Sequence, residues 1–174
     1  EMDVRDESSV ALGIDKIIQQ AKQIDVLVNN SGVGFFGAIE ETSIEEASKI
    51  LDTNVLGILR TVKAVLPHMR AEGSGRIINL SSVLGFLPAP YMGLYAASKH
   101  AVEGLSESLD HEVRQFGIRV ALVEPAYTKT NFEANSPQPA SLLPAYHDER
   151  KRAARKNQTN MTNAPGPESV VDAI

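Results

Sequence analysis

Apolar residues show two different spacing patterns along this chain. Three short runs rich in valine, isoleucine and leucine have the length and composition of buried β-strands, and they cover residues 25–29, 76–80 and 118–123. Elsewhere apolar residues recur every three or four positions, which is the spacing of one helix face. This second pattern predicts helices over about residues 10–21, 47–69 and 95–115.

The predicted helices carry local signals at their ends. The long middle helix is preceded by Ser43 and Glu46, which stand three positions apart and can form a capping box. It ends near Gly73, and the third helix ends before Gly117, because glycine readily takes the left-handed conformation that terminates a helix.

Strands and long helices therefore alternate along most of the chain. This order predicts an α/β fold, a doubly wound parallel sheet with helices packed on both of its faces. Right-handed connections bring the carboxyl ends of parallel strands to one edge of the sheet, where such folds bind ligands. We expect residues 1–174 to form a single domain with its chemistry at that edge.

The pattern breaks down over residues 132–167, where prolines interrupt it. Here we expect a mobile excursion from the fold with one or two short helices. Its basic run, residues 150–156, follows two acidic residues and is typical of a solvated helix face, with an anionic substrate or phosphate as the alternative ligand. A final helix is predicted to begin near Pro167.

Composition narrows the classes of function. The 174 residues carry 17 Lys and Arg against 22 Asp and Glu, a net charge of −5, which argues against a nucleic-acid-binding surface. There is no cysteine, so disulfides, thiolate zinc sites and cysteine nucleophiles are excluded, and we assign no residue to a metal. No apolar run approaches the roughly 18 residues of a membrane span. We expect a cytoplasmic protein that binds neither membrane nor nucleic acid.

Candidate chemistry centres on Tyr95 and Lys99, which stand four positions apart in a predicted helix and so share one face. A nearby ammonium group can lower the pKa of a phenol, which then exchanges protons near neutral pH. By itself such a pair is a common surface feature. Ser82 favours the catalytic interpretation, because it ends an apolar strand and a loop with glycine and proline can return the chain from there to Tyr95.

Asn54 is the most informative single polar residue, because it lies on the apolar stripe of the long predicted helix. A buried amide without hydrogen-bond partners costs the fold about 1–3 kcal/mol. Two interpretations stay open. Asn54 is either a core asparagine bonded to nearby backbone, or an amide that holds a water or opens the helix ladder beside an active centre.

Two segments that directly follow strands also have two interpretations. One is Asn29-Asn30-Ser31-Gly32, and the other runs from Pro125 to Thr130. Their residue types are ordinary turn chemistry. The functional interpretation makes the first a backbone platform for a ribose or nicotinamide ring, and makes the second a contact for the carboxamide and phosphates of a dinucleotide.

In this order, the segments resemble the classical branch of the short-chain dehydrogenase/reductase family over essentially the whole chain. Residues 29–32 match the family's Asn-Asn-Ala-Gly, and Asn54 matches its helix asparagine. Residues 79–82 match Asn-x-Ser-Ser, and Tyr95 with Lys99 matches Tyr-x-x-x-Lys. Residues 125–130 match Pro-Gly-x-x-x-Thr. An Asp-Val pair that faces adenine in the family is similar to Asp3-Val4. Residues 83–117 resemble the branch that handles steroids, retinoids and other lipophilic alcohols.

The resemblance implies a Rossmann-like, three-layer fold and an oxidoreductase that transfers a hydride between NAD or NADP and a carbonyl compound or secondary alcohol. Tyr95 would be the general acid or base, and Lys99 would lower its pKa and bind the nicotinamide ribose. Ser82 would orient the substrate oxygen, and Asn54 would hold a water. The implied cofactor contacts are Asp3, Val4, Asn29, Asn30, Ser31, Gly32, Tyr95, Lys99, Pro125, Ala126, Thr128 and Thr130.

The resemblance extends to the pocket and the assembly. An apolar substrate pocket would form from residues 84–94 and 132–162, with Phe86, Leu87, Tyr91, Met92, Leu142 and Leu143 as its lining. The helices that carry Asn54 and Tyr95 would form the interface of a homodimer or homotetramer.

The chain departs from the family in two respects. Ala126 replaces the glycine of Pro-Gly-x-x-x-Thr. The glycine-rich turn that seats the cofactor pyrophosphate in the family is not among these residues, and neither are the family's first two strands and its last strand. We therefore expect the middle and late part of a longer enzyme, truncated at the N-terminus, which by itself binds dinucleotide poorly and is inactive.

Two alternative functions remain open. One is a non-catalytic dinucleotide-binding sensor on the same fold, which the loss of a catalytic residue would favour. The other is an epimerase or dehydratase of the family's extended branch, which shares Tyr-x-x-x-Lys. The segment 29–32 and Asn54 argue for the classical branch instead.

Overall fold

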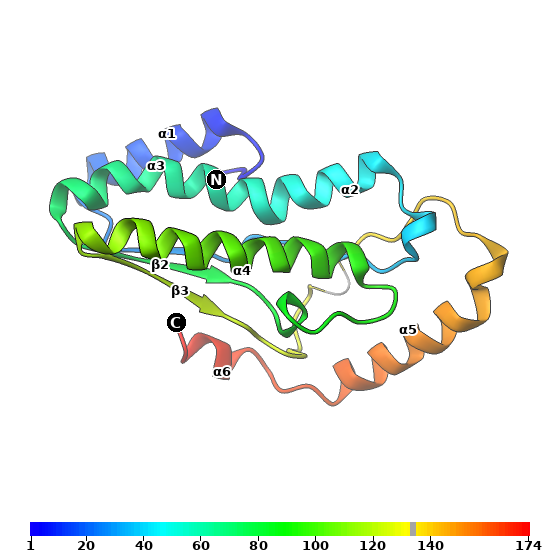
Figure 1. Cartoon of the computed structure of the whole chain (residues 1–174). Coiled ribbons are helices and arrows are strands. Elements are labelled where there is room, and N and C mark those ends of the chain that lie inside the picture. Colours follow the sequence, from blue (N-terminus) through cyan, green and yellow to red (C-terminus); the bar gives the residue numbers. More distant parts are fainter. Residues whose placement is uncertain (133–134) are drawn as a thin grey trace.

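A parallel sheet forms the centre of the fold (Figure 1). The computed structural model describes residues 1–132 and 135–174, and in this part β1 (Val26–Asn29), β2 (Gly75–Leu80) and β3 (Ile118–Val123) lie side by side in chain order. Each strand begins and ends within one residue of its predicted run. Asn29 lies opposite Asn79 and Leu80 opposite Val123, so the three strands end at one edge as predicted.

Three helices cover one face of this sheet: α1 (Glu7–Ala21), α3 (Gly57–Glu72) and α4 (Gly93–Val113). Their apolar stripes meet the inward side chains of the strands in one core, whose burial is the main favourable term in folding. The buried core consists of Val10, Ile14, Ile58, Val62, Val65, Met69, Ile77, Val102, Leu109, Val113 and Ile118.

The α/β fold with a parallel sheet is confirmed, but the predicted second layer of helices is not formed by the described residues. α1, α3 and α4 all lie on the same side (Figure 1). Val26 and Val28 of β1 are 49% and 40% exposed, whereas Leu27 between them packs on the core. The reason is the strand order, because right-handed crossovers that move the chain in one direction across a sheet place their helices on one face.

The long middle helix is interrupted, where the apolar stripe predicted a single helix. α2 (Ile44–Leu51) leads into a π-helical turn, η2 (Asp52–Leu56), and then into α3. The predicted capping box is confirmed at its start: Ser43 Oγ accepts from Glu46 N at 3.1 Å, and Glu46 Oε2 accepts from Ser43 N at 2.8 Å. A π-turn widens the helix only locally, so the stripe continues through it.

Helices α3 and α4 end close to the glycines that were predicted to terminate them, Gly73 and Gly117. α4 is followed by a 3₁₀ turn, η4 (Arg114–Phe116), and then by Gly117 with φ 72°, while Gly73 after α3 has φ 68°. A Cβ on Gly117 would lie 2.1 Å from the carbonyl oxygen of Gly73, so the two helix ends approach each other at a distance that only glycine permits.

The excursion is more regular than predicted. In place of short helices it holds a 3₁₀ turn, η5 (Pro144–Tyr146), and the 16-residue helix α5 (His147–Thr162), followed by α6 (Glu168–Val171). Residues 133 and 134 of the predicted excursion lie outside the described residues. Most of the basic run is exposed on α5, as predicted, but the Arg150 side chain is only 12% exposed.

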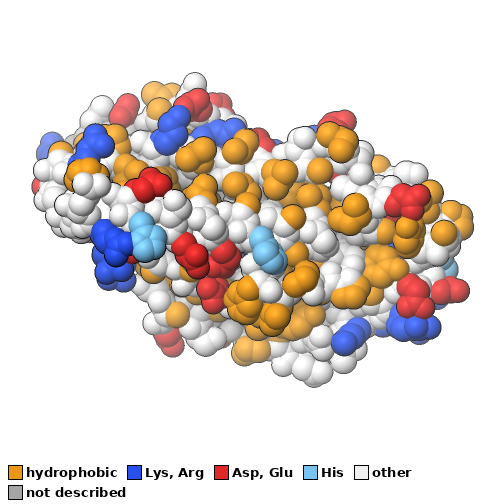
Figure 2. All heavy atoms as spheres, in the orientation of Figure 1, with side chains coloured by type: hydrophobic (Ala, Val, Ile, Leu, Met, Phe, Trp, Pro, Cys, Tyr) orange, Lys and Arg blue, Asp and Glu red, His pale blue; other side chains and the backbone are white. Residues whose placement is uncertain are grey.

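The surface carries both charged and apolar side chains. Charged groups surround a band of apolar side chains on the face shown in Figure 2. Within residues 1–132 and 135–174, no helix combines the length and the apolar character needed to span a membrane.

Candidate active site

Buried amide side chains join the ends of β1 and β2. Asn29 Nδ2 donates to Asn79 Oδ1 at 2.8 Å, and Asn79 Nδ2 donates to Ser106 Oγ of α4 at 2.8 Å. Thr61 Oγ1 of α3 donates to Asn29 Oδ1 at 2.7 Å. The network partners these buried amides and fixes α3 and α4 against the edge of the sheet where the strands end.

Asn54 lies in η2, where it is 1% exposed. Its Oδ1 accepts from Val33 N at 2.8 Å, and its Nδ2 donates to Val33 O at 2.9 Å and to Ser98 Oγ of α4 at 3.0 Å. Asn54 is therefore bonded to nearby backbone, and it also stands where the helix ladder opens. The amide pins the loop after β1 to α4.

Lys99 is buried beside this loop. Its Nζ donates to the carbonyl oxygen of Leu80, at the end of β2, at 2.6 Å. A Cβ placed on Gly32 would lie 3.4 Å from Asn54 Oδ1 and 3.9 Å from Lys99 Nζ, so these groups surround one space that a larger residue would fill. Burial lowers the pKa of Lys99 to about 8, and the carboxylate of Glu103 acts in the opposite direction.

Tyr95 and Ser82 meet as predicted, but the pKa of the phenol does not move in the predicted direction. Burial raises the pKa of Tyr95 to about 12, and the Ser82 side chain opposes this shift. The predicted lowering by Lys99 is wrong for this arrangement. Lys99 Nζ is 5.7 Å from the Tyr95 ring centroid and donates to Leu80 O, and burial of the phenol sets the direction of the shift.

Some of the predicted cofactor contacts gather in a small hollow beside η2. Val4, Asn29 and Ser31 line it together with Thr53, Gly57 and Ile58. A Cβ on Gly57 would come within 3.0 Å of Val4 Cγ2, so the bare backbone of Gly57 makes room for Val4. Asn30, between two of the lining residues in the sequence, is exposed to solvent.

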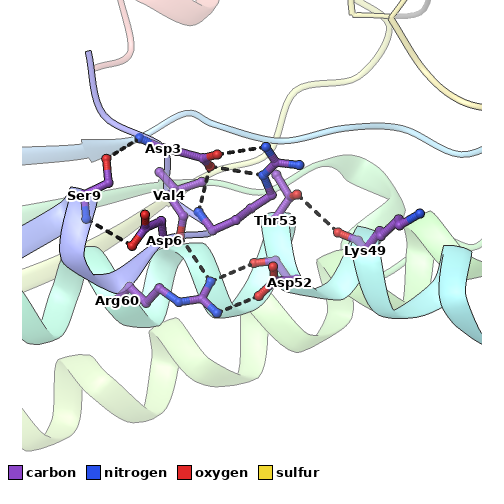
Figure 3. A network of polar contacts seen from close by, with 9 residues as sticks. Asp3, Val4, Asp6, Ser9, Lys49, Asp52, Thr53 and Arg60 are labelled. Carbon is purple, nitrogen blue, oxygen red and sulfur yellow. Dashed lines mark hydrogen bonds and ion pairs between the residues drawn. The ribbon is translucent and has the colours of Figure 1, made fainter.

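The segment that carries Val4 is tied to η2 by Arg60, which the sequence did not single out (Figure 3). Arg60 Nη1 donates to Val4 O at 3.1 Å, and Arg60 Nη2 forms an ion pair with Asp52 Oδ1 at 2.6 Å. The Asp3 carboxylate accepts from Arg5 N and Arg5 Nη2 at 2.9 and 2.8 Å, and these hydrogen bonds lower its pKa to about 2. One guanidinium thus connects the predicted adenine segment to the turn that holds Asn54.

The segment after β3 reaches the site through Pro125. Pro125 O accepts from Val83 N at 3.0 Å and from Ser82 Oγ at 3.4 Å. Thr128 Oγ1 donates to Ala126 O at 3.3 Å, and Thr130 Oγ1 accepts from Phe132 N at 3.2 Å. The threonine hydroxyls therefore support the local turn, while the backbone adjoins Ser82.

Two aromatic pairs join separate segments, and one of them includes Tyr95. The ring centroid of Phe132 is 5.6 Å from that of Tyr95, and Phe36 lies 5.9 Å from Tyr91. Phe86 and Leu87, predicted to line the pocket, are 51% and 59% exposed. Phe36 was not predicted.

The sequence interpretation also missed polar residues that support the site from helices. Thr61, Ser98 and Ser106 are each at most 2% exposed and bond to Asn29, Asn54 and Asn79 respectively. The signal that identified Asn54, a polar residue on an apolar helix face, could have found them.

Comparison with known proteins agrees with this geometry. Residues 1–140 match the family described as short chain dehydrogenase, and the chain belongs to that family. A 3-ketodihydrosphingosine reductase of Bacteroides thetaiotaomicron is 46% identical over 134 residues, which are 77% of this chain and 50% of the reductase. The chain spans about half the length of the curated relatives it matches.

Solved structures share the fold. A short chain dehydrogenase/reductase from Burkholderia phymatum in complex with NAD superposes with a TM-score of 0.80 at 29% identity, covering 94% of this chain and 60% of that one. ElxO with NADP bound gives a TM-score of 0.72 at 38% identity, covering 74% of this chain and 52% of its own.

Proposed function

We propose that the protein carrying this chain transfers a hydride between NAD or NADP and a carbonyl compound or secondary alcohol. One observation carries the proposal. Four side chains from three separate parts of the fold, Tyr95 and Lys99 of α4, Asn54 of η2 and Ser82 after β2, converge where the parallel strands end. A proton donor, a buried cation and a hydroxyl in one place suit acid–base chemistry at a substrate oxygen.

The residues present fit the nicotinamide half of the cofactor. The backbone of Gly32 leaves space beside Lys99 Nζ, where an ammonium can bond a ribose hydroxyl. Val4 and Ser31 in the hollow, and the backbone at Pro125 and Ala126, are the other groups that would hold the cofactor. When bound, NAD(P) supplies or accepts the hydride. The bound relatives support a nicotinamide dinucleotide without favouring NAD or NADP.

Tyr95 carries the proton that reduction of a carbonyl compound requires. With its pKa raised to about 12 by burial, the phenol is protonated at neutral pH. It donates this proton to the substrate oxygen as the hydride reaches the carbonyl carbon, and the product is the alcohol. Ser82, whose side chain opposes the rise in the pKa of Tyr95, orients the substrate oxygen, and the Lys99 ammonium lies 5.7 Å from the Tyr95 ring centroid.

We propose a lipophilic substrate. Phe132 provides an apolar surface beside Tyr95, and Phe86, Leu87 and Leu142, from the segments predicted to form the pocket, are exposed apolar side chains. The name of the Bacteroides relative, a 3-ketodihydrosphingosine reductase, supports the same class.

A homodimer or homotetramer is the assembly we propose. Leu51, Leu56 and Leu59, on the segment that carries Asn54, are 38–43% exposed, which is typical of apolar side chains that an interface can cover.

The location that we propose is the cytoplasm, because a composition without cysteine fits a reducing environment.

The test is an assay of the complete protein with reduced NAD and NADP and a panel of ketones and aldehydes of increasing apolar size. We expect oxidation of the reduced cofactor, followed by its near-ultraviolet absorbance, with the larger apolar carbonyl compounds. Cofactor binding without turnover of any panel member would overturn the proposal in favour of the sensor.

A further inference from the structure

The most deeply buried carboxylate with a distant partner lies outside the candidate active site. Glu41 is the last residue of the 3₁₀ turn η1 (Ile39–Glu41), and its side chain is 0% exposed. A buried carboxylate is unfavourable unless it is paired and hydrogen-bonded. The fold must therefore supply partners for Glu41.

Those partners come mostly from the excursion. Glu41 Oε1 accepts from Leu143 N at 2.8 Å and forms an ion pair with Arg150 Nη1. Glu41 Oε2 accepts from Ala38 N in its own turn at 3.1 Å. Burial alone would raise the pKa of Glu41, but these donors together hold it below its ordinary value, so the carboxylate is charged at neutral pH.

Two neighbouring acids bind the same stretch of the excursion, residues 135–150, which we call the strap. Glu46 Oε1 accepts from Ala140 N at 2.8 Å, and Glu40 Oε2 accepts from Tyr146 OH at 2.5 Å. The strap is thus held to the segment before and within α2 by three carboxylates. Figure 1 shows the start of α5 at the same end of the molecule as the start of α2.

The strap continues from this attachment toward Tyr95. Phe36 N donates to Pro137 O at 3.5 Å, and a Cβ on Gly37 would lie 2.2 Å from Pro139 Cγ, so Gly37 lets the strap lie close. Gly34 approaches Ser136 and Phe132 in the same way. The Phe132 ring in turn lies 5.6 Å from the Tyr95 ring, in a tilted arrangement. A chain of contacts therefore joins Arg150 to the proton donor.

An ion pair of this kind specifies one arrangement. Compared with apolar packing a buried pair adds little net stability, but an arrangement that leaves one partner buried and unpaired is strongly disfavoured. If the strap moved away, Glu41 would lose two of its donors. The strap thus has one favoured position.

We propose that Glu41 and Arg150 are positioning residues that hold the strap as a wall of the substrate pocket beside Tyr95. The role of the strap in a substrate pocket rests on the proposed function, whereas its attachment through Glu41 and Arg150 does not. The pair acts on the affinity for an apolar substrate rather than on the proton transfer.

The test compares Arg150→Met with the matched control Lys151→Met in the complete protein. Both variants remove one positive charge and one trypsin cleavage site from the start of α5, but Lys151 is exposed and Arg150 is not. We expect Arg150→Met to be cleaved by trypsin within α5 about tenfold faster than wild type. Its KM for an apolar carbonyl should rise about fivefold, with kcat and cofactor affinity within about twofold.

Lys151→Met should match wild type in both measurements. Arg150→Lys keeps the charge and should fall between the two, which separates loss of the ion pair from a general folding defect. Wild-type cleavage and wild-type KM in Arg150→Met would overturn the proposal. If wild type turns over no carbonyl compound, the proposed function fails, and equal trypsin rates in the two methionine variants would then refute the strap attachment separately.

Discussion

Two buried polar tethers fix the loops around Tyr95, and they differ in charge. Asn54 holds the loop after β1 to α4 through a neutral amide that bonds Val33 and Ser98. Glu41 holds the strap through a carboxylate paired with Arg150. Both are almost completely buried, and both join segments that are far apart in the sequence.

The difference follows from what lies next to each tether. Asn54 Oδ1 and Lys99 Nζ border the same space at Gly32. A carboxylate at residue 54 would place a negative charge beside the Lys99 ammonium and would pair with it. An amide provides the hydrogen bonds without that charge. At Glu41 a charge is harmless to the chemistry and gives the strap a single position.

Of the two tethers, the neutral one is expected to give the larger effect when it is broken. Asn54→Leu leaves Val33 N and Val33 O without this partner, at about 1–3 kcal/mol for each group that stays unsatisfied, while Ser98 Oγ keeps its bond to Tyr95 O. We expect turnover of the complete protein to fall roughly a hundredfold, because the loop beside Lys99 is displaced. Urea unfolding and steady-state kinetics measure the two effects.

Ser48→Ala is the control for that variant. Ser48 Oγ donates to Ile44 O on the exposed side of α2, and its loss should change stability by less than about 0.5 kcal/mol. Equal stability of Asn54→Leu and Ser48→Ala would show that the amide is not a tether.

The charge of Lys99 gives the second prediction. Its pKa is about 8 in the folded protein, against 10.5 for an unperturbed lysine, so between these values the folded protein binds fewer protons than the unfolded chain. Stability should therefore rise with pH across this window, by at most about 3 kcal/mol. Lys99→Met should remove the rise, as measured by urea midpoints from pH 8 to 10.5.

Tyr95 provides an internal check, because its shift has the opposite sign. Its pKa is raised from 10.0 to about 12, so stability should fall as pH rises through that interval, and Tyr95→Phe should remove the fall. A flat profile for the wild-type protein between pH 8 and 10.5 would contradict the burial of a charged Lys99.

The smallest effect concerns Arg60, which forms a third, ionic tether. Its side chain is 21% exposed, so it is less buried than the tethers at Asn54 and Glu41. Arg60→Met frees the segment that carries Val4, and we expect binding of the adenosine monophosphate half of the cofactor to weaken about fivefold. Lys63→Met, which breaks an exposed 3.7 Å pair with Glu7 one turn further along α3, is the control. Titration calorimetry with adenosine monophosphate and with nicotinamide mononucleotide distinguishes the two halves.

Local patterns were sufficient to predict most of the fold. β2 was expected over 76–80 and forms over 75–80, because an apolar run of that length is buried wherever it lies. The π-turn was not predicted, since one inserted residue leaves the apolar stripe intact. Asn54 on that stripe was the only sign of it.

Long-range pairs could not be predicted. Arg150 stands in a basic run typical of a solvated face, and Glu41 stands among acids typical of an exposed helix start. Their pairing joins residues 109 positions apart and has no local signal. The direction of the Tyr95 pKa shift was wrong for a related reason, because burial and the competing acceptor Leu80 O are properties of the folded chain alone.

The most direct test of the central claim, that Tyr95 is the proton donor, is a paired measurement on Tyr95→Phe in the complete protein. We predict dinucleotide binding within about twofold of wild type and turnover reduced by roughly a thousandfold, in the range that general acid catalysis provides. Retention of more than about a tenth of wild-type turnover would contradict the claim, because such a rate is too high for an enzyme that has lost its general acid.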